Sequence, residues 1–405
     1  MQQKYFYVII WLCLLSIFPH SQAFAANRTE IRAYWAALPC SEETLWEDMP
    51  VTSAPYQTGT LTSSARHSAS EYVNFMRWLS NLNPVRLSDY CAMYAQHGAV
   101  ILASNDVAEH APPCPEDMDD DFYQTAYDGA RRCNIACLHS PSKNPMWDAV
   151  LSFAMDEGEN NLELPHRRWL LNPNMLETDF GYAVSDSGQG YALMYAVDVS
   201  AAQTFSEAVC YPAQGAFPAE FLSPDTPWSI SLPDNASDIC VSLWEETSDA
   251  AWTLRDDGWQ EDGYCVVSSA PYGTGTCLIF LPDLHKAGLE DYFQNQIWHV
   301  SVCGANFASE YAVEMISLTE IDVVSVEISP QTAQMYPHET LTLSACAVPA
   351  YADDVSVAWH SENPNVASVS ECGIVTAVSE GTCRIIAESA NGKQDVCIVT
   401  VHSAL

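Results

Sequence analysis

The spacing of apolar residues divides the chain into three parts. In residues 27–207 they first recur at helical intervals, as with Phe75, Trp78, Leu79 and Leu82. Only later does this part contain short strand-like runs, "DFGYAVS" and "GYALMYAVD". Helices that precede and cover a small sheet indicate an α+β domain.

The other two parts show no helical period and consist of short strand-like runs. Residues 208–321 contain "WSISL", "YCVVSS" and "CLIFLP", separated by turn residues at intervals typical of a β-sandwich. Residues 322–402 alternate more sharply, and Asn391-Gly392 lies between two alternating runs, which predicts a β-hairpin. The pattern therefore predicts an α+β domain followed by two all-β domains.

The predicted hairpin also sets a register for two cysteines. A two-residue loop at Asn391-Gly392 pairs Cys383 with Thr400 and Cys397 with Ile386. Because neither cysteine faces the other, we expect no disulfide between them, and any bridge that they form would reach another cysteine.

The first 26 residues have the layout of a secretory signal peptide. Lys4 precedes an apolar run of about ten residues that ends in "AFAA", so we expect cleavage near Ala25 or Ala26. No later segment approaches the about 20 apolar residues that cross a bilayer. The mature chain is therefore expected to be secreted and extracellular, free or associated with a cell surface.

Cysteine usage agrees with secretion. Of the 15 cysteines, Cys13 lies in the signal peptide, and the even number that remains predicts disulfides in an oxidising compartment. The sequence alone does not show which cysteines pair.

The net charge excludes one class of partner. With 52 acidic and 15 basic residues, the chain carries a formal charge of −37. Nucleic acid binding needs clustered Lys and Arg that this chain lacks, so we expect no nucleic acid partner. The acidic run "EDMDDDF" does not form a calcium loop of the EF-hand type, because Phe122 stands where that loop needs glycine.

Two ordered motifs mark the third part. They are W-x-S-x-N-P-x-V-A-x-V, beginning at Trp359, and G-x-V-T-A-V-x-x-G-T, beginning at Gly373. With these motifs the segment resembles a bacterial immunoglobulin-like (Ig-like) domain of group 2. The resemblance implies a spacer or adhesive module of a bacterial surface and no chemistry.

A second resemblance concerns the first part. The stretches "NFMRWLSNL", "AEHAPP", "GARRCNIA" and "GENNLELPHRRWLLNPNMLETDFGYA" resemble the CAP superfamily (cysteine-rich secretory proteins, antigen 5 and pathogenesis-related proteins), in its secreted bacterial form. This resemblance implies a CAP-type α-β-α sandwich for residues 27–207. Residues 208–321 are similar to the β-rich extension that often follows that form.

One histidine stands out in the motif "LPHRRWLLNP". Pro165 suits the first position of a helix, and Pro173 ends it after about two turns, which places His166 in the first turn. Trp169 shares its helix face. The positive end of the helix dipole favours a neutral imidazole, which is able to bind a metal or accept a hydrogen bond. Without the family resemblance, a histidine on an apolar helix face is more often a satisfied core residue than a ligand.

The CAP resemblance implies a specific site. In that family two histidines face each other across a cleft beside carboxylates and hold a divalent ion, and His110 and His166 match them by motif. The matching acidic positions hold Cys133 and Val150 instead. A zinc ion takes three or four protein ligands, so a site for zinc or another divalent cation needs further ligands beside the two histidines. The candidate supporting residues of the cleft are Asp156, Glu157, Arg167 and Trp169. Arg167 and Arg168 are able to clamp a ligand's carboxylate or phosphate, but in so acidic a chain such arginines more often pair with local Asp or Glu.

Three functional hypotheses follow. The leading one is a secreted, non-catalytic CAP protein whose histidine-lined cleft binds a small or lipidic ligand, with or without a divalent metal. The alternative is a surface or host adhesion protein that binds a glycan or a protein through its Ig-like modules. The third is a metal-dependent peptidase or cell-wall hydrolase. The missing carboxylates and the lack of HExxH or GxSxG motifs count against catalysis, and no catalytic residue is assigned.

Overall fold

The computed structural model describes residues 26–39, 44–139, 144–200, 207–248 and 250–403. The predicted signal peptide lies almost wholly outside these residues. None of the described helices is long and apolar enough to cross a membrane.

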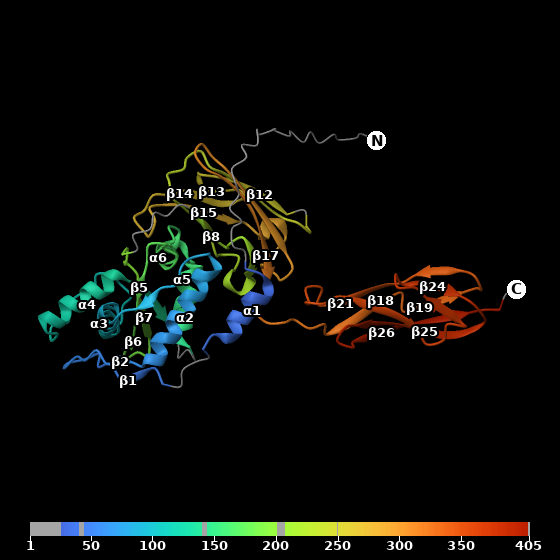
Figure 1. Cartoon of the computed structure of the whole chain (residues 1–405), viewed down its shortest axis with the longest axis horizontal. Helices are drawn as coiled ribbons and strands as arrows, with labels where there is room; N and C mark the ends of the chain where they lie inside the picture. Colours follow the sequence, from blue (N-terminus) through green and yellow to red (C-terminus); the bar gives the residue numbers. More distant parts are fainter. Residues whose placement is uncertain (1–25, 40–43, 140–143, 201–206, 249, 404–405) are drawn as a thin grey trace.

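The first part is built around a three-stranded antiparallel sheet in the order β4-β7-β6. Side chains of β7 alternate between two cores: Tyr191 and Leu193 pack with α3 and α4, whereas Ala192 and Met194 pack with α2 and α5. Helices therefore cover both faces of the sheet (Figure 1). The elements of this part are α1 (Arg28–Ala37), β1 (Trp46–Asp48), β2 (Thr60–Leu61), α2 (Ser63–Leu79), β3 (Arg86–Leu87), α3 (Asp89–Asn105), α4 (Asp120–Arg132), β4 (Cys133–Leu138), α5 (Pro145–Met155), the short 3-10 helix η1 (Glu159–Asn161), α6 (Pro165–Leu170), β5 (Glu177–Thr178), β6 (Phe180–Val184) and β7 (Gly190–Tyr195).

Helix α3 lies unusually close to its neighbours because glycines face it. A Cβ atom on Gly181 of β6 would lie 2.2 Å from the Ala95 carbonyl oxygen, and one on Gly129 of α4 would lie 2.0 Å from the Tyr94 oxygen. Only glycine permits such backbone contact. The predicted mixture of helices and sheet is confirmed, and the CAP-type sandwich stays a prediction.

The second part contains two five-stranded sheets that pack face to face. Their orders are β13-β14-β15-β10-β8 and β12-β11-β16-β17-β9. Trp228 of one sheet meets Trp298 of the other, with ring centroids 6.1 Å apart. The elements are β8 (Val209–Tyr211), β9 (Gly215–Pro218), η2 (Ala219–Phe221), β10 (Trp228–Leu232), β11 (Cys240–Glu245), β12 (Ala251–Arg255), β13 (Gly258–Gln260), β14 (Gly263–Ser268), β15 (Thr276–Pro282), η3 (His285–Ala287), β16 (Ile297–Cys303) and β17 (Ala308–Ile316).

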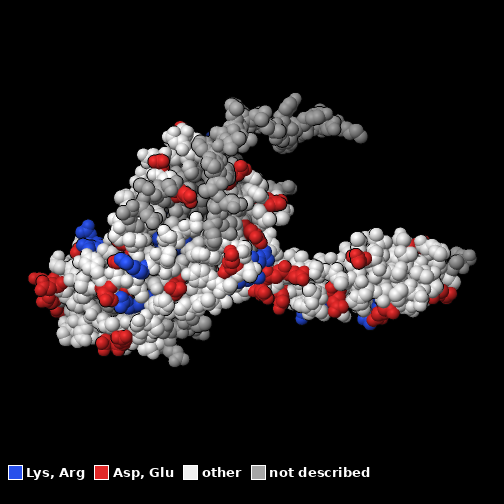
Figure 2. Space-filling view, viewed as in Figure 1, with Lys and Arg blue, Asp and Glu red and all other residues white. Residues whose placement is uncertain are grey.

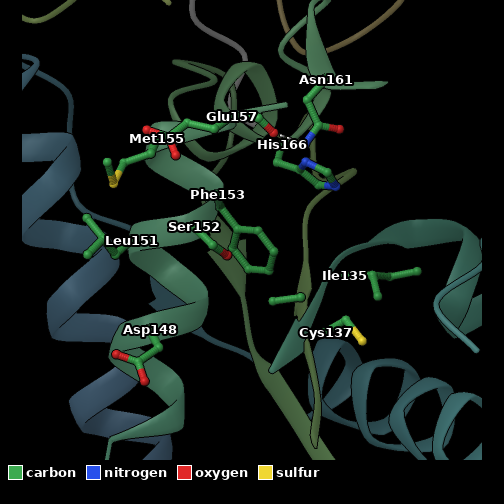
Figure 3. Close-up of a pocket in the computed structure, with 11 residues that line it drawn as sticks. Ile135, Cys137, Asp148, Leu151, Ser152, Phe153, Met155, Glu157, Asn161 and His166 are labelled. Carbon is green, nitrogen blue, oxygen red and sulfur yellow. Dashed lines mark hydrogen bonds between the residues drawn. The ribbon is translucent and has the colours of Figure 1, made fainter. Parts of the chain in front are cut away.

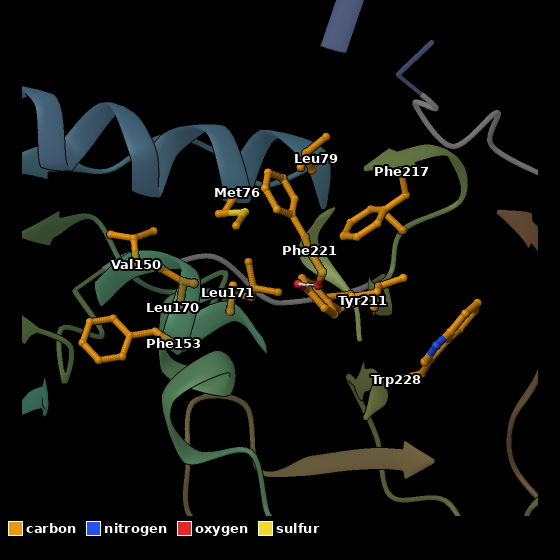
Figure 4. Packing of buried hydrophobic residues seen from close by; sticks show 14 of the residues in the cluster. Met76, Leu79, Val150, Phe153, Leu170, Leu171, Tyr211, Phe217, Phe221 and Trp228 are labelled. Carbon is orange, nitrogen blue, oxygen red and sulfur yellow. Dashed lines mark hydrogen bonds between the residues drawn. The ribbon is translucent and has the colours of Figure 1, made fainter. Parts of the chain in front are cut away.

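The first two parts share one hydrophobic core. Phe221 of the second part contacts the rings of Trp35, Phe75 and Trp147 of the first. The same cluster continues through Leu170 to Trp228 (Figure 4). The boundary predicted at residue 207 therefore lies between two parts with different folds that pack against each other through a common core.

The third part has a core of its own and projects away from the other two (Figure 1). Its strands form the sheets β18-β21, β19-β26-β25-β22 and β20-β24-β23. They are β18 (Ser325–Ser329), β19 (Thr332–Met335), β20 (Thr340–Thr342), β21 (Ser344–Val348), β22 (Val357–Ser361), β23 (Ala367–Val369), β24 (Ile374–Ala377), β25 (Gly381–Ser389) and β26 (Gln394–Val401).

The predicted hairpin forms, but its predicted register is wrong by one residue. Cys383 pairs with Val399, and Ile385 pairs with Cys397. The Ser389 N–H donates to the Lys393 carbonyl, so the loop has three residues and Gly392 adopts a left-handed φ of 81°. Three-residue loops with such a left-handed position are the next commonest hairpin connection.

The predicted disulfides are not confirmed. All thirteen described cysteines are unpaired, and Cys40 lies outside the described residues. The cysteines are spread over separate cores, and most strand cysteines lie opposite another residue type; Cys265, for example, pairs with Phe280. One exception is Cys240, whose register partner is Cys303.

Candidate functional site

His166 is fixed by a carboxylate from the preceding helix. Leu164 precedes α6 in a left-handed conformation, Pro165 is the first helical residue, and His166 lies in the first turn as predicted. Asp156, just beyond α5, accepts hydrogen bonds from the N–H groups of His166 and Arg167, both at 2.9 Å, and contacts His166 Nδ1 at 2.7 Å. Because a carboxylate only accepts, Nδ1 carries the proton, and Nε2 is left for other contacts.

The two predicted cleft histidines line the same pocket. This pocket has a volume of about 150 Å³ and contains His110, His166 and Trp169 in its wall. His110 Nδ1 lies 2.6 Å from the Ala130 carbonyl oxygen, so its Nε2 is also left for other contacts. The structure thus places three of the candidate residues around one small cavity.

A larger pocket lies against the same histidine. Its volume is about 410 Å³, and polar and apolar side chains mix in its wall (Figure 3). Glu157 lines it and accepts hydrogen bonds from the hydroxyl groups of Ser223 and Thr226 in the second part. The ring of Phe153 stacks on His166, with centroids 5.7 Å apart. Asp156 and Glu157 are therefore both close to His166, but only Glu157 lines a pocket.

Arg167 was predicted as a cleft residue, and that prediction is wrong. Its side chain is buried and donates to the carbonyl oxygens of Ala154, Met155 and Pro227, while the guanidinium lies 4.1 Å from the centroid of the Tyr211 ring. Burial lowers the pKa of Arg167 from its ordinary value. A guanidinium satisfied in this way cannot reach a ligand.

Sequence reasoning missed the cations that do line the small pocket. Arg131 and Arg132, in the last turn of α4, lie in its wall together with Tyr272 from the second part. Both arginines belong to the motif "GARRCNIA", but nothing in a helical pattern shows that the end of α4 approaches α6. Tyr272 comes from a loop more than a hundred residues away along the chain, which local pattern cannot place.

The residues present do not fit a divalent metal ion. Among the described residues, no group of three or more His, Cys, Asp or Glu side chains is arranged to hold one. Burial raises the pKa of the Cys133 thiol well above its ordinary value, so this residue is a poor source of thiolate. His110 and His166 supply two ligands where zinc takes three or four, beside two guanidinium groups.

Comparison with known proteins concerns the third part. The family model of the bacterial Ig-like domain (group 2) matches residues 322–399. A relative, the Ig-like virion protein of Serratia phage KSP90, is 36% identical over 88 residues, which are 21% of this chain and 34% of the relative. The chain thus matches about a third of that relative's length.

Solved structures resemble the chain only distantly. An intimin mutant of EHEC O157:H7 is 18% identical, with 19% of this chain and 45% of the other covered and a TM-score of 0.16. Domains 4 and 5 of the S-layer protein SbsC are 17% identical, with 26% and 64% covered and a TM-score of 0.18. The family match shows that residues 322–399 form a bacterial Ig-like domain of group 2, as the sequence predicts.

Proposed function

We propose that this protein acts at a cell surface or outside the cell as an adhesion protein, and that it binds a surface glycan or protein through its Ig-like domain. The observation that carries the proposal is the group 2 match over residues 322–399, in a module with its own core that projects from the rest of the molecule.

The geometry leaves the module free to bind. Its hydrogen bonds to the other parts that the structure describes come from the segment 351–353, which precedes β22 and leaves the strands of the module away from this junction. Seven large apolar side chains of the module are exposed by more than two fifths: Val324, Tyr336, Tyr351, Val355, Ile374, Val378 and Ile398.

The test uses the full mature chain with a fluorescent label. We expect it to be retained on glycan and host-protein arrays, and we expect Tyr336→Ala or Ile374→Ser to reduce retention several-fold. Met49→Ala removes an even more exposed apolar side chain from the first part and serves as the control. Retention that depends on the first part and is unchanged by every substitution in the module would contradict the proposal.

A second candidate is a non-catalytic CAP protein that binds a small or lipidic ligand. The sharing of one pocket by His110 and His166, and the helices on both faces of the β4-β7-β6 sheet, support it. A fluorescent fatty acid should bind the full chain in the larger pocket, and Ile135→Trp, which fills that pocket, should abolish binding. Val324→Trp, at an exposed position, should leave it unchanged.

A further inference from the structure

Basic side chains are scarce in this chain, and nearly all of those that the structure describes are engaged. Arg28, Arg32, Arg66, Arg86, Arg132, Lys286 and Arg384 lie against carboxylates, while Arg77, Arg167 and Arg168 are buried and donate to backbone carbonyl oxygens. Arg131 belongs to neither group, and nor do Arg255 and Lys393, but of these three only Arg131 lines a pocket described above. Its guanidinium carbon lies 5.8 Å from the centroid of the Tyr127 ring.

Arg131 lines the small pocket beside Arg132, His110 and His166, and no Asp or Glu lines that pocket. Two carboxylates outside the wall contact groups near the pocket. Asp156 is buried and already accepts three hydrogen bonds from His166 and Arg167, and Asp128 pairs with Arg132 at 3.4 Å, which leaves Arg131 without a carboxylate partner among the described residues. The pocket therefore gathers two guanidinium groups and two imidazoles without an acidic partner in its wall.

The net charge of the chain, −37, does not neutralise the positive charge of the groups that line the pocket. At physiological ionic strength, interactions between exposed charges are screened beyond about 8 Å. The groups that line a cavity of about 150 Å³ lie within that range of a ligand inside it, so they decide which charge the cavity accepts.

We propose that this pocket binds a compact anion, a phosphate or carboxylate group, with Arg131 as its principal partner. Guanidinium groups match such anions with two parallel hydrogen bonds. The imidazoles are held through Nδ1 by Ala130 and Asp156, so each Nε2 is free to add a donor when it carries a proton. This site is independent of adhesion by the Ig-like domain. The anion that it would bind has a charge opposite to that of the metal ion implied by the CAP resemblance.

Calorimetric titration of the full mature chain tests the proposal, with inorganic phosphate in one arm and acetate in the other. We expect saturable one-to-one binding of at least one anion, weakened about tenfold in Arg131→Gln, since a hydrogen bond to a charged group contributes about that factor. Arg131→Lys, which keeps the charge, should retain part of the affinity. Arg255→Gln removes the same charge from an exposed side chain of β12 and should change nothing.

Three results would overturn the proposal. One is the absence of saturable heat with both anions. Another is equal weakening in Arg131→Gln and Arg255→Gln, which would indicate non-specific attraction. The third is saturable zinc binding that disappears in a His110→Ala, His166→Ala double variant and is undiminished in Arg131→Gln.

Discussion

At the scale of single residues, adjacent arginines join the first part to the second. Arg167 donates to Pro227, and Arg168 donates to Ala270 and Gly275, so two neighbouring side chains hold two different loops of the β-sandwich. The carbonyl oxygen of Pro227, a buried residue, would otherwise lack this donor, which costs about 1–3 kcal/mol. These guanidinium groups are structural and act on backbone, not on a ligand.

Replacing Arg167 should destabilise the protein strongly. Arg167→Met keeps an apolar side chain but leaves three buried carbonyl oxygens without their donor, and we expect the free energy of unfolding to fall by about 3–5 kcal/mol. Urea denaturation measures this change. Arg86→Met, at a side chain that is 75% exposed, should change it by less than about 0.5 kcal/mol. A fall for Arg167→Met as small as for Arg86→Met would refute a structural role.

The sequence predicted the position of His166 but not the role of Arg167, for a physical reason. Pro165 and Pro173 set the ends of α6 by local backbone rules, which depend on a few neighbouring residues. The partners of Arg167 include Pro227, sixty residues further on, and no local rule brings these residues together. For the same reason Arg131 was missed: its pocket forms where the end of α4 and the start of α6 both meet β4.

At the scale of elements, the register of paired strands decides which cysteines are able to form a disulfide with each other. Cys383 and Cys397 lie on paired strands but face Val399 and Ile385, whereas Cys240 lies directly opposite Cys303. Asn391-Gly392 located the hairpin of β25 and β26 but gave the wrong register. A two-residue loop would be closed by residues 390 and 393, whereas the observed loop is closed by Ser389 and Lys393. Loop length is set by backbone conformation at Gly392, which the residue types do not specify.

Oxidation should join Cys240 to Cys303. The Glu246 N–H donates to the Ile297 carbonyl, and hydrogen-bonded pairs recur every second residue, so Cys240 and Cys303 form such a pair with Cα atoms about 5.5 Å apart. That separation lies within the disulfide range of about 4.4–6.8 Å. With oxidised glutathione, the two thiols lose two electrons and two protons, and two molecules of reduced glutathione leave.

Peptide mass mapping after oxidation detects the bridge. Cys346 is exposed and faces Glu327 across its strand pair, so it should form a mixed disulfide with glutathione but no internal bridge. In Cys240→Ser, Cys303 should behave like Cys346. Recovery of Cys240 and Cys303 only as separate, unlinked peptides would show that the strand ends hold the sulfur atoms apart.

At the scale of the whole molecule, Asp353 makes the ion pairs that join the Ig-like domain to the other parts. Gln294 and Asn295 add hydrogen bonds to the carbonyl oxygens of residues 351 and 352. Asp353 accepts hydrogen bonds from Arg28 and Arg32 of α1 at 2.8–3.1 Å, and α1 in turn reaches Glu314 of the β-sandwich. Basic and acidic side chains meet at this junction (Figure 2). The helix at the start of the described chain thereby sets the direction in which the domain at its end projects.

This junction should loosen in acid. Partial burial by itself would raise the pKa of Asp353, but hydrogen bonds from Arg32 and the Ile321 N–H outweigh it and lower the pKa to about 2 from an ordinary 3.8. Since the pKa is lower in the folded state, the ionised carboxylate stabilises the junction above about pH 4, and this contribution disappears as the pH falls towards 2. Small-angle X-ray scattering should therefore show a constant arrangement of the domain from pH 7 to about 4 and a broader distribution below.

Asp353→Asn should produce the broader distribution already at pH 7, because a neutral amide removes the ion pairs with both arginines. Glu362→Gln breaks the exposed pair with Arg384 inside the Ig-like domain and should leave the scattering unchanged. If Asp353→Asn gives the same scattering curve as the wild type, the remaining contacts hold the domain instead. These are the hydrogen bonds from Gln294 and Asn295 to the carbonyl oxygens of residues 351 and 352, and the stacked rings of Phe293 and Tyr351, with centroids 6.1 Å apart.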